Sequence, residues 1–267
     1  MPLRIVQSKQ NSRLKDLRRL LAHPAQQAGA LAAIEGPNLI AEALRAGLRV
    51  ETVFVAQGSE DLLEALALPS QTEVLLAPRE ILESALSTES PQPIAALIEP
   101  PAWSWEDLLP PGTSTARLLL ILAGVQDPGN LGTILRSAEA FGAQAILSLP
   151  GTVSAWNPKA VRASAGSLFR LPLLSVSAEQ CFAKLRGAGV TVWTTAVHGA
   201  QAAHRIDLAA PVALIIGNEG NGVPEALAAL ADGAVTIPCP GPVESLNAAV
   251  AASVLLYEAA RQRGNSQ

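Results

Sequence analysis

The stretch RLLLILAGVQDPGNLGTILRSAEAFGAQAILSLP, residues 117–150, decides the fold. Its first nine residues are almost all apolar, which is typical of a strand that is buried on both faces. The segment NLGTILRSAEAFGA then repeats apolar residues at helical spacing and ends at Gly142, and QAILSLP predicts a second strand. A strand, a helix and a strand in this order predict two parallel strands joined by a crossover helix.

The same alternation continues toward the C-terminus. The pattern predicts strands at 190–197, 211–217 and 234–238 and helices at 157–167, 178–189, 223–231 and 244–263. Near-continuous apolar strands separated by helices indicate a parallel sheet that is covered on both faces. We therefore expect an α/β domain over residues 117–267.

Residues 1–98 predict a second, smaller α/β domain. Residues 11–22 predict a helix with Asn11 or Ser12 as N-cap, and its apolar positions predict four buried leucines: Leu14, Leu17, Leu20 and Leu21. Short apolar runs then alternate with helical patterns up to residue 98, and Pro37 and Gly47 mark the start and end of one helix. Residues 99–116, with four prolines, predict the linker.

Composition excludes several classes of protein. The chain has 267 residues, of which 49% are hydrophobic, so a large core is expected. It shows no apolar run of the ~18 residues that a membrane helix needs and no signal-peptide pattern. Cys181 and Cys239 are far apart and match no disulfide framework or zinc spacing, so we expect no metal. The sequence predicts a soluble, cytoplasmic protein.

The net charge of −4 hides a segregation along the chain. Residues 1–20 carry six basic groups and one acidic group, a net charge of +5. Residues 21–110 have a net charge of −10, and residues 111–267 have a net charge of +1. A basic segment on an acidic chain favours a polyanionic partner, although the same residues also fit the solvated face of a helix.

Three loops at the expected carboxyl ends of strands are rich in Gly, Asn and Pro, and ligands of parallel α/β sheets bind at such ends. The first loop opens a helix whose expected N-cap is Asn130. Gly132 and Arg136 are four residues apart on this helix and share the face opposite its apolar stripe. A bare face with one arginine suits an anion, although this motif alone favours the simpler alternative, a capped helix with one surface arginine.

The second loop, GNEGNGVP at 217–224, follows the strand VALII. It is neither GxGxxG nor a P-loop, so a dinucleotide or ATP site is poorly supported. Its carboxylate, Glu219, would repel a phosphate and suits a cationic or hydroxyl-bearing ligand. The third loop, residues 237–247, ends in Ser245-Leu246-Asn247, where hydroxyl and amide groups come close to a helix start. Both loops also fit ordinary turns and caps.

Taken in order, the three loops resemble the signature motifs of the SpoU (TrmH-like) branch of the SPOUT RNA methyltransferases. The first resembles N-x-G-x-x-x-R, here Asn130, Gly132 and Arg136. The second resembles a strand followed by G-x-E-x-x-G, here Gly217 to Gly222, and the third resembles I-P followed by S-L-N, here Ile237-Pro238 and Ser245-Leu246-Asn247. Residues 11–98 are similar, less specifically, to the family's substrate-binding domain, which has the fold of a small ribosomal RNA-binding protein.

The resemblance implies a fold, a reaction and an assembly. The fold would be a SPOUT domain whose C-terminal end forms a deep trefoil knot, an exception to unknotted topology. The reaction would be methyl transfer from S-adenosylmethionine to a ribose 2′-hydroxyl of RNA. Ribosomal RNA is favoured because NPKAVRASAGSLFRLP resembles a segment of members that act on large-subunit RNA, and transfer RNA stays an alternative. The family forms homodimers through this domain.

The resemblance also implies a role for individual residues. The catalytic set would be Asn130, Arg136, Glu219, Ser245 and Asn247. The cofactor would be bound by Thr195, Ala196, Gly217, Asn218, Ile237 and Leu246, largely through their backbones. The candidate RNA contacts are Lys9, Asn11, Arg13 and Arg162, which fit an ordinary charged surface equally.

Two rivals from other classes stay open at this point. A catalytically inactive RNA-binding protein of the same fold would have little need of the complete set of Asn130, Arg136, Glu219 and Asn247. A dinucleotide oxidoreductase would need GxGxxG and a downstream carboxylate for the ribose. Saturable binding of S-adenosylmethionine would discriminate the enzyme from the inactive protein.

Overall fold

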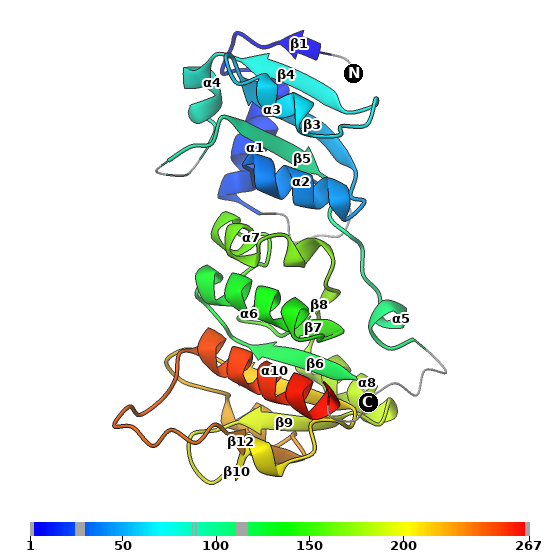
Figure 1. The fold of residues 1–267 in the computed structure, drawn as a ribbon, viewed down its shortest axis with the longest axis vertical. Coiled ribbons are helices and arrows are strands. Elements are labelled where there is room, and N and C mark those ends of the chain that lie inside the picture. The colour runs from blue at the N-terminus through cyan, green and yellow to red at the C-terminus, as the bar shows by residue number, and fades with distance from the viewer. Residues whose placement is uncertain (1–2, 25–29, 87, 89, 111–116, 265–267) are drawn as a thin grey trace. The chain divides into compact units, whose positions relative to one another are not determined.

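The computed structural model describes residues 3–24, 30–86, 88, 90–110 and 117–264 (Figure 1). The chain forms two compact units. The first unit comprises the chain up to Ala102 together with Trp156–Arg170, and the second comprises Trp103–Ala155 and the chain from Leu171 onward. Residues 156–170 therefore pack with the first unit, although they lie inside the sequence of the second. Residues 111–116 of the expected linker are outside the described residues.

The described part of the first unit has a five-stranded mixed sheet in the order β1-β4-β3-β5-β2. Strands β1 and β3 are parallel to β4, and β5 is antiparallel to both β2 and β3. The strands are β1 (Leu3–Ile5), β2 (Ala32–Glu35), β3 (Val50–Ala56), β4 (Glu73–Ala77) and β5 (Ile94–Ile98). The helices are α1 (Ser12–Ala22), α2 (Pro37–Arg45), α3 (Asp61–Glu64), α4 (Arg79–Glu83) and α7 (Pro158–Ser164), with a 3-10 turn, η1 (Ser167–Phe169).

Helix α1 confirms the pattern read from the sequence. Asn11 is its N-cap, and the side-chain oxygen of Asn11 accepts hydrogen bonds from the backbone of Arg13 and Leu14. The four leucines expected at the core are all buried. Pro37 is likewise at the start of α2, and Gly47 follows its end with a φ of +74°.

The second unit contains, among the described residues, a seven-stranded sheet in the order β10-β12-β9-β11-β6-β7-β8, and every pair is parallel. The strands are β6 (Leu118–Ala123), β7 (Ala145–Ser148), β8 (Leu173–Ser175), β9 (Thr191–Thr195), β10 (Gln201–Ala202), β11 (Val212–Gly217) and β12 (Gly233–Thr236). The helices are α5 (Trp105–Leu108), α6 (Pro128–Ala140), α8 (Ala178–Gly187), α9 (Glu225–Ala228) and α10 (Ala248–Gly264), with a 3-10 turn, η2 (Ala203–Arg205).

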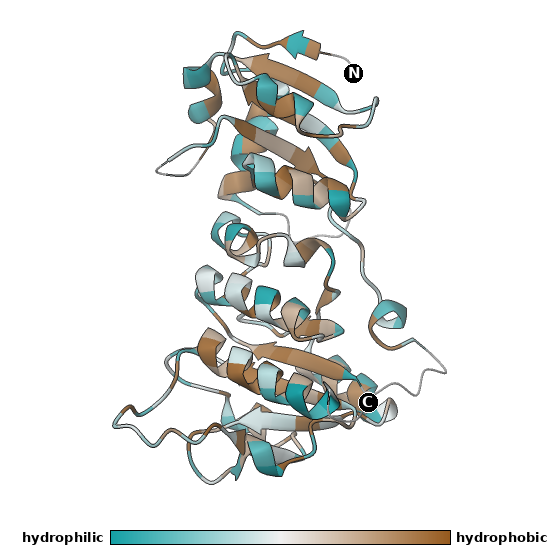
Figure 2. Ribbon diagram, in the orientation of Figure 1, coloured by the Kyte–Doolittle hydropathy of each residue, from teal (hydrophilic) through white to brown (hydrophobic). Residues whose placement is uncertain are grey.

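Helices cover both faces of this sheet, as expected. Helices α6 and α10 pack against each other, and α10 also contacts β11 (Figure 1). Helix α8 packs on the other face, where Cys181, Phe182 and Leu185 join a core cluster with Leu119 and Ile121. Strand β6 is hydrophobic along its whole length in Figure 2, and all six of its residues are buried.

Three local expectations were wrong. The last helix begins at Ala248 and not at Glu244, because the side chain of Asn247 accepts hydrogen bonds from the backbone of Ala249 and Val250 and so caps it. The expected linker includes helix α5, which begins with a capping box between Ser104 and Asp107. Gly132 is buried and does not lie on a bare face, because its helix also packs against α10.

Candidate functional site

The candidate site lies where the carboxyl ends of four neighbouring strands meet. Strands β12, β9, β11 and β6 are adjacent and parallel, so the loops after them emerge at one edge of the sheet. The three motif loops are those after β6, β11 and β12. The sequence predicts that each motif loop follows a strand, and the strand order shows that these strands lie close together in the sheet.

Glu219 connects the loop after β11 to the loop after β6. Its Oε1 accepts hydrogen bonds from the backbone N–H of Asp127, at 3.1 Å, and from Nδ2 of Asn130, at 3.0 Å. Its Oε2 accepts one from the backbone N–H of Gln126, at 3.2 Å. Sequence reasoning missed Gln126 and Asp127, because a backbone N–H leaves no trace in residue type.

Hydrogen bonds lower the pKa of Glu219 below its ordinary value. Partial burial of the carboxyl group acts to raise this pKa, but donors from Asn130, from the backbone of Glu219 itself, and from Gln126 and Asp127 together outweigh it. Glu219 is therefore an anion at neutral pH, and it places a fixed negative charge at the mouth of the site.

Asn130 extends this connection to the third loop. Its Oδ1 accepts a hydrogen bond of 3.0 Å from Nδ2 of Asn247, while its own Nδ2 donates to Glu219. Asn130 can make both contacts because it is not the helix cap that the sequence suggested. Asp127 is the N-cap of α6, and its side chain accepts from the backbone N–H of Asn130. The dipeptide Asp127-Pro128, an acidic cap before a proline at the first helical position, was the overlooked signal.

We call Glu219, Asn130 and Asn247 the amide chain. Their side chains form a continuous row of hydrogen bonds across all three motif loops. Arg136 and Ser245 lie outside it: both are exposed, and within the described ranges no hydrogen bond or ion pair joins Arg136 to Glu219 or Asn247. Arg136 lies on α6, six residues or about 1.7 turns beyond Asn130.

The loop after β11 folds back tightly on its own strand. Asn218 and Gly222 exchange two backbone hydrogen bonds of 2.9 Å, and the Asn218 side chain accepts from the backbone of Gly220 and Asn221 and donates to the Gly124 carbonyl. A Cβ on Gly217 would lie only 2.2 Å from the carbonyl carbon of Gly222. Gly217 is therefore required by close approach, and the Asn218 side chain holds the loop to the end of β6.

The remaining cofactor candidates lie at the same edge. Thr195 ends β9, and its hydroxyl donates to the Ile215 carbonyl at 2.8 Å, while the backbone N–H of Ala196 donates to Val235. Ile237 directly follows β12, and Leu246 precedes the Asn247 cap of α10. These residues are uncharged and half-buried, and they lie at or just after the ends of β9, which neighbours the strand before the anionic Glu219, and of β12, which neighbours β9. This set fits S-adenosylmethionine, which has a flat uncharged adenine ring and a cationic sulfonium, better than it fits a phosphate.

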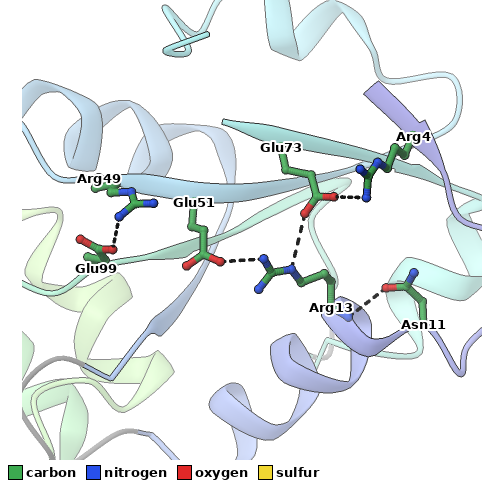
Figure 3. Close-up of polar contacts among 7 residues, drawn as sticks. All are labelled: Arg4, Asn11, Arg13, Arg49, Glu51, Glu73 and Glu99. Atoms are coloured by element: carbon green, nitrogen blue, oxygen red, sulfur yellow. Dashed lines mark hydrogen bonds and ion pairs between the residues drawn. The ribbon is translucent and has the colours of Figure 1, made fainter. Parts of the chain in front are cut away.

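The candidate RNA residues near the N-terminus differ in how much charge they can offer. The Arg13 guanidinium pairs with Glu51 at 2.8 Å and with Glu73 at 3.5 Å, and Asn11 is occupied as the helix cap (Figure 3). Arg4 also pairs with Glu73, at 3.2 Å. Lys9 is exposed, with no ion pair among the described residues. The basic segment is thus part of the first unit's sheet and first helix, and it partly neutralises that unit's acidic charge.

Arg162 lies on α7, within the first unit. The side chain is exposed, and α7 contacts β2. Next to α7, Trp156 and Phe169 stack with their ring centroids 6.1 Å apart, and Arg170 pairs with Glu42. Arg162 thus belongs to the first unit, whereas the amide chain belongs to the second unit.

Two protein-family models match different parts of this chain. Residues 117–257 match the SpoU rRNA Methylase family, and residues 33–104 match the family described as RNA 2′-O ribose methyltransferase substrate binding. Because the first match spans more than half of the chain, the protein belongs to the SpoU rRNA methylase family. It is an S-adenosylmethionine-dependent RNA 2′-O-ribose methyltransferase.

Similar proteins cover nearly the whole chain. The 23S rRNA (guanosine(2553)-2′-O)-methyltransferase RlmP of Bacillus subtilis is 35% identical over 94% of this chain and 97% of its own length. The crystal structure of AviRb from Streptomyces viridochromogenes in complex with AdoMet has a TM-score of 0.81 at 31% identity, covering 95% of this chain and 98% of its own. An AdoMet-bound rRNA methyltransferase from Sinorhizobium meliloti has a TM-score of 0.82 at 31% identity, covering 97% and 98%.

A membrane-spanning helix and a metal-binding cluster are both absent from the described residues. No described helix is long and apolar enough to cross a membrane. The described ranges also contain no group of three His, Cys, Asp or Glu residues that could hold a metal ion. Both cysteines are free: Cys181 is buried and Cys239 is exposed.

Proposed function

We propose that this protein methylates a ribose 2′-hydroxyl in large-subunit ribosomal RNA, in the cytoplasm and as a homodimer. The amide chain of Glu219, Asn130 and Asn247 is the observation that supports catalysis, because an inactive binding protein has no need to join three loops in this way. The relatives that cover most of the chain, from Bacillus subtilis and Streptomyces viridochromogenes, are named as 23S rRNA methyltransferases and support this substrate.

The protein's own residues have three tasks in this reaction. When bound, S-adenosylmethionine supplies a methyl group that is already electrophilic on its sulfonium. The 2′-oxygen would form the new bond to the methyl carbon as the carbon–sulfur bond breaks with its electrons left on sulfur, and the hydroxyl proton would pass to solvent water. The site must therefore orient the hydroxyl in line, accept or direct its proton, and stabilise charge on the oxygen.

The amide chain supports the first task. Asn130 is fixed from both sides, so its position at the start of α6 is set before RNA arrives. We propose that Asn130 shapes the acceptor pocket and that Ser245, exposed in the third loop, contacts the ribose. Glu219 acts through Asn130 and the loop backbone, which makes it a positioning residue.

Arg136 supports the third task, the stabilisation of charge on the oxygen. A guanidinium is effectively always charged, so we propose that Arg136 binds the phosphate next to the acceptor and stabilises the developing alkoxide rather than acting as the base. Arg136→Lys should then keep part of the methyl-transfer activity, with an unchanged pH–rate profile. A profile that follows the lysine instead would favour the base role.

An exposed apolar stripe on α10 supports the homodimer. Val250, Val254 and Tyr257 recur at helical spacing and are 48%, 38% and 56% exposed. Tyr257 also contacts Phe141 edge to face, with ring centroids 5.9 Å apart. A stripe of this kind marks an interaction site, and it belongs to the second unit, next to α6 and its Arg136.

The test of the proposed function is a map of 2′-O-methyl sites in total RNA from cells with and without the gene. We expect one site in large-subunit ribosomal RNA to disappear, and purified protein with S-adenosylmethionine to restore it. Loss of a transfer RNA site would favour the alternative substrate. If no site disappears and calorimetry shows no saturable cofactor binding, the inactive RNA-binding protein is the better description.

A further inference from the structure

Glu35, at the end of β2, is a buried carboxylate with half of its hydrogen-bonding capacity unused. Its Oε1 accepts from the Thr88 hydroxyl and from the backbone N–H of Gln92, both at 2.8 Å. Its Oε2 is buried and accepts no hydrogen bond from the described residues, and the residue as a whole is only 5% exposed. A buried charge in this state is costly, so it calls for a partner.

A small cavity that is lined by Glu35 indicates which side chain can pair with its Oε2. The cavity has a volume of about 10 Å³, room for about one water molecule. Among the described residues that line it, Glu35 and Arg162 alone are charged, and their charges are opposite. The remaining lining is apolar: Leu21, Ala33, Ile34, Leu39, Pro158 and Val161.

The backbone around Arg162 is held firmly against the first unit. Helix α7 contacts β2, and Arg170 pairs with Glu42 on α2. Gly166 approaches the same Glu42 so closely that a Cβ would lie 2.7 Å from its Cβ, at a φ of +90°. Packing, rather than the charge of Arg162, therefore sets the distance between Arg162 and Glu35.

We propose that Glu35 is a positioning residue for Arg162 in RNA binding. The free Oε2 attracts the guanidinium across the cavity, directly or through one water molecule, and so restricts its orientation. A guanidinium has five N–H donors, so those that face Glu35 leave others for an RNA phosphate. This inference rests on the proposed function, because it takes Arg162 as an RNA contact.

The experiment is a double-mutant cycle of Glu35→Gln and Arg162→Ala. The RNA is large-subunit ribosomal RNA isolated from cells that lack the gene, and KM for RNA, kcat, the Kd of S-adenosylmethionine and the salt dependence of RNA binding are measured. Each single variant should raise KM a few-fold and lower the salt slope by about one, with kcat and cofactor affinity unchanged. The double variant should equal Arg162→Ala, since Glu35 acts only through that arginine.

Glu80→Gln, on an exposed carboxylate of the same unit, is the matched control and should change none of these quantities. Additive effects, or a Glu35→Gln variant with an unchanged salt slope, would overturn the inference. If Glu35→Gln does not fold, Arg162→Met should lower the Tm more than Lys15→Met does, because only Arg162 neighbours a buried anion; equal shifts would overturn it. Failure of the wild-type protein to methylate this RNA would instead count against the proposed function.

Discussion

At the scale of the residue, Asn130 is the centre of the site, since among the described side chains it alone forms hydrogen bonds with both Glu219 and Asn247. Asn130→Ala removes both contacts and leaves Glu219 with only its backbone donors. We expect kcat for methyl transfer to fall by about a hundred- to a thousandfold, the order of effect when one preorganised polar group is lost from a catalytic site. Single-turnover assays at saturating cofactor would measure it.

Thr133→Ala is the control for this change. Thr133 lies on the same helix, and its hydroxyl only donates to the Gly129 carbonyl. It should leave kcat near the wild-type value. Equal losses for the two variants would mean that α6 as a whole, and not the amide chain, supports activity.

Individual residues also show what the sequence could and could not reveal. Asn11 as a cap, Pro37 as a helix start and Gly217 as an obligatory glycine depend on local chemistry, so they could be predicted. The pairing of Glu219 with Asn130 spans 89 residues and depends on strand order, which no local pattern contains. For the same reason no local pattern indicates that Arg13 is partly neutralised by Glu51 and Glu73.

At the scale of the element, the close approach of Gly217 to Gly222 in the loop after β11 can be tested by substitution. Gly217→Ala places a methyl group 2.2 Å from the backbone of Gly222 and forces the loop to move. We expect a loss of stability of about 1–3 kcal/mol and a cofactor Kd at least tenfold higher, because the displaced loop is the one that lines the proposed cofactor site. Calorimetry and thermal unfolding would measure both.

Gly220→Ala, three residues along the same loop, provides the comparison. Its nearest neighbour would be the Asn218 side chain at 3.6 Å, an ordinary contact. It should bind the cofactor like the wild type, and parallel losses in both variants would contradict the steric argument.

The last turns of α10 make a second prediction at this scale, in acid. The largest cause is a hydrogen bond from Arg261, which lowers the pKa of Glu258. A hydrogen bond from Gln262 and the charge of Arg261 act in the same direction, and partial burial opposes them. Together these effects lower the pKa of Glu258 from 4.5 to about 2. A lowered pKa in the folded state stabilises the fold above pH 4.5, and this stability is lost as the pH falls from 4.5 to about 2. Glu258→Gln should therefore flatten the fall of Tm over that range, which thermal unfolding at several pH values would reveal.

Among elements, the long and strongly patterned ones were predictable and the short ones were not. Strand β11 occupies residues 212–217 of the strand expected at 211–217, and α1 begins at Ser12, directly after the expected cap Asn11. Strands β1, β8 and β10 have three residues or fewer, so the sheet rather than the sequence defines them. The packing of residues 156–170 with the first unit is a tertiary choice, which periodicity cannot reveal.

At the scale of the whole molecule, the apolar stripe on α10 makes the homodimer testable. Tyr257→Glu puts a charge on the most exposed residue of that stripe. We expect the variant to sediment as a monomer while unfolding at a temperature close to that of the wild type, because an exposed side chain adds little to the fold. Analytical ultracentrifugation would measure the mass.

Leu3→Glu makes the matching change on the first unit, where Leu3 is 53% exposed. It should leave the mass unchanged. A wild-type protein that is already monomeric at micromolar concentration would contradict the homodimer directly. The trefoil knot also belongs to this scale, and it stays a prediction.

The amide chain has a consequence for how the enzyme matures. Its three members come from positions 130, 219 and 247, so the last of them leaves the ribosome only when most of the polypeptide has been synthesised. The first unit can fold early, since all but one short segment of it precedes Trp103. A nascent chain would therefore fold most of the unit that matches the substrate-binding family before it forms the amide chain. We expect an incomplete chain to bind RNA without methylating it.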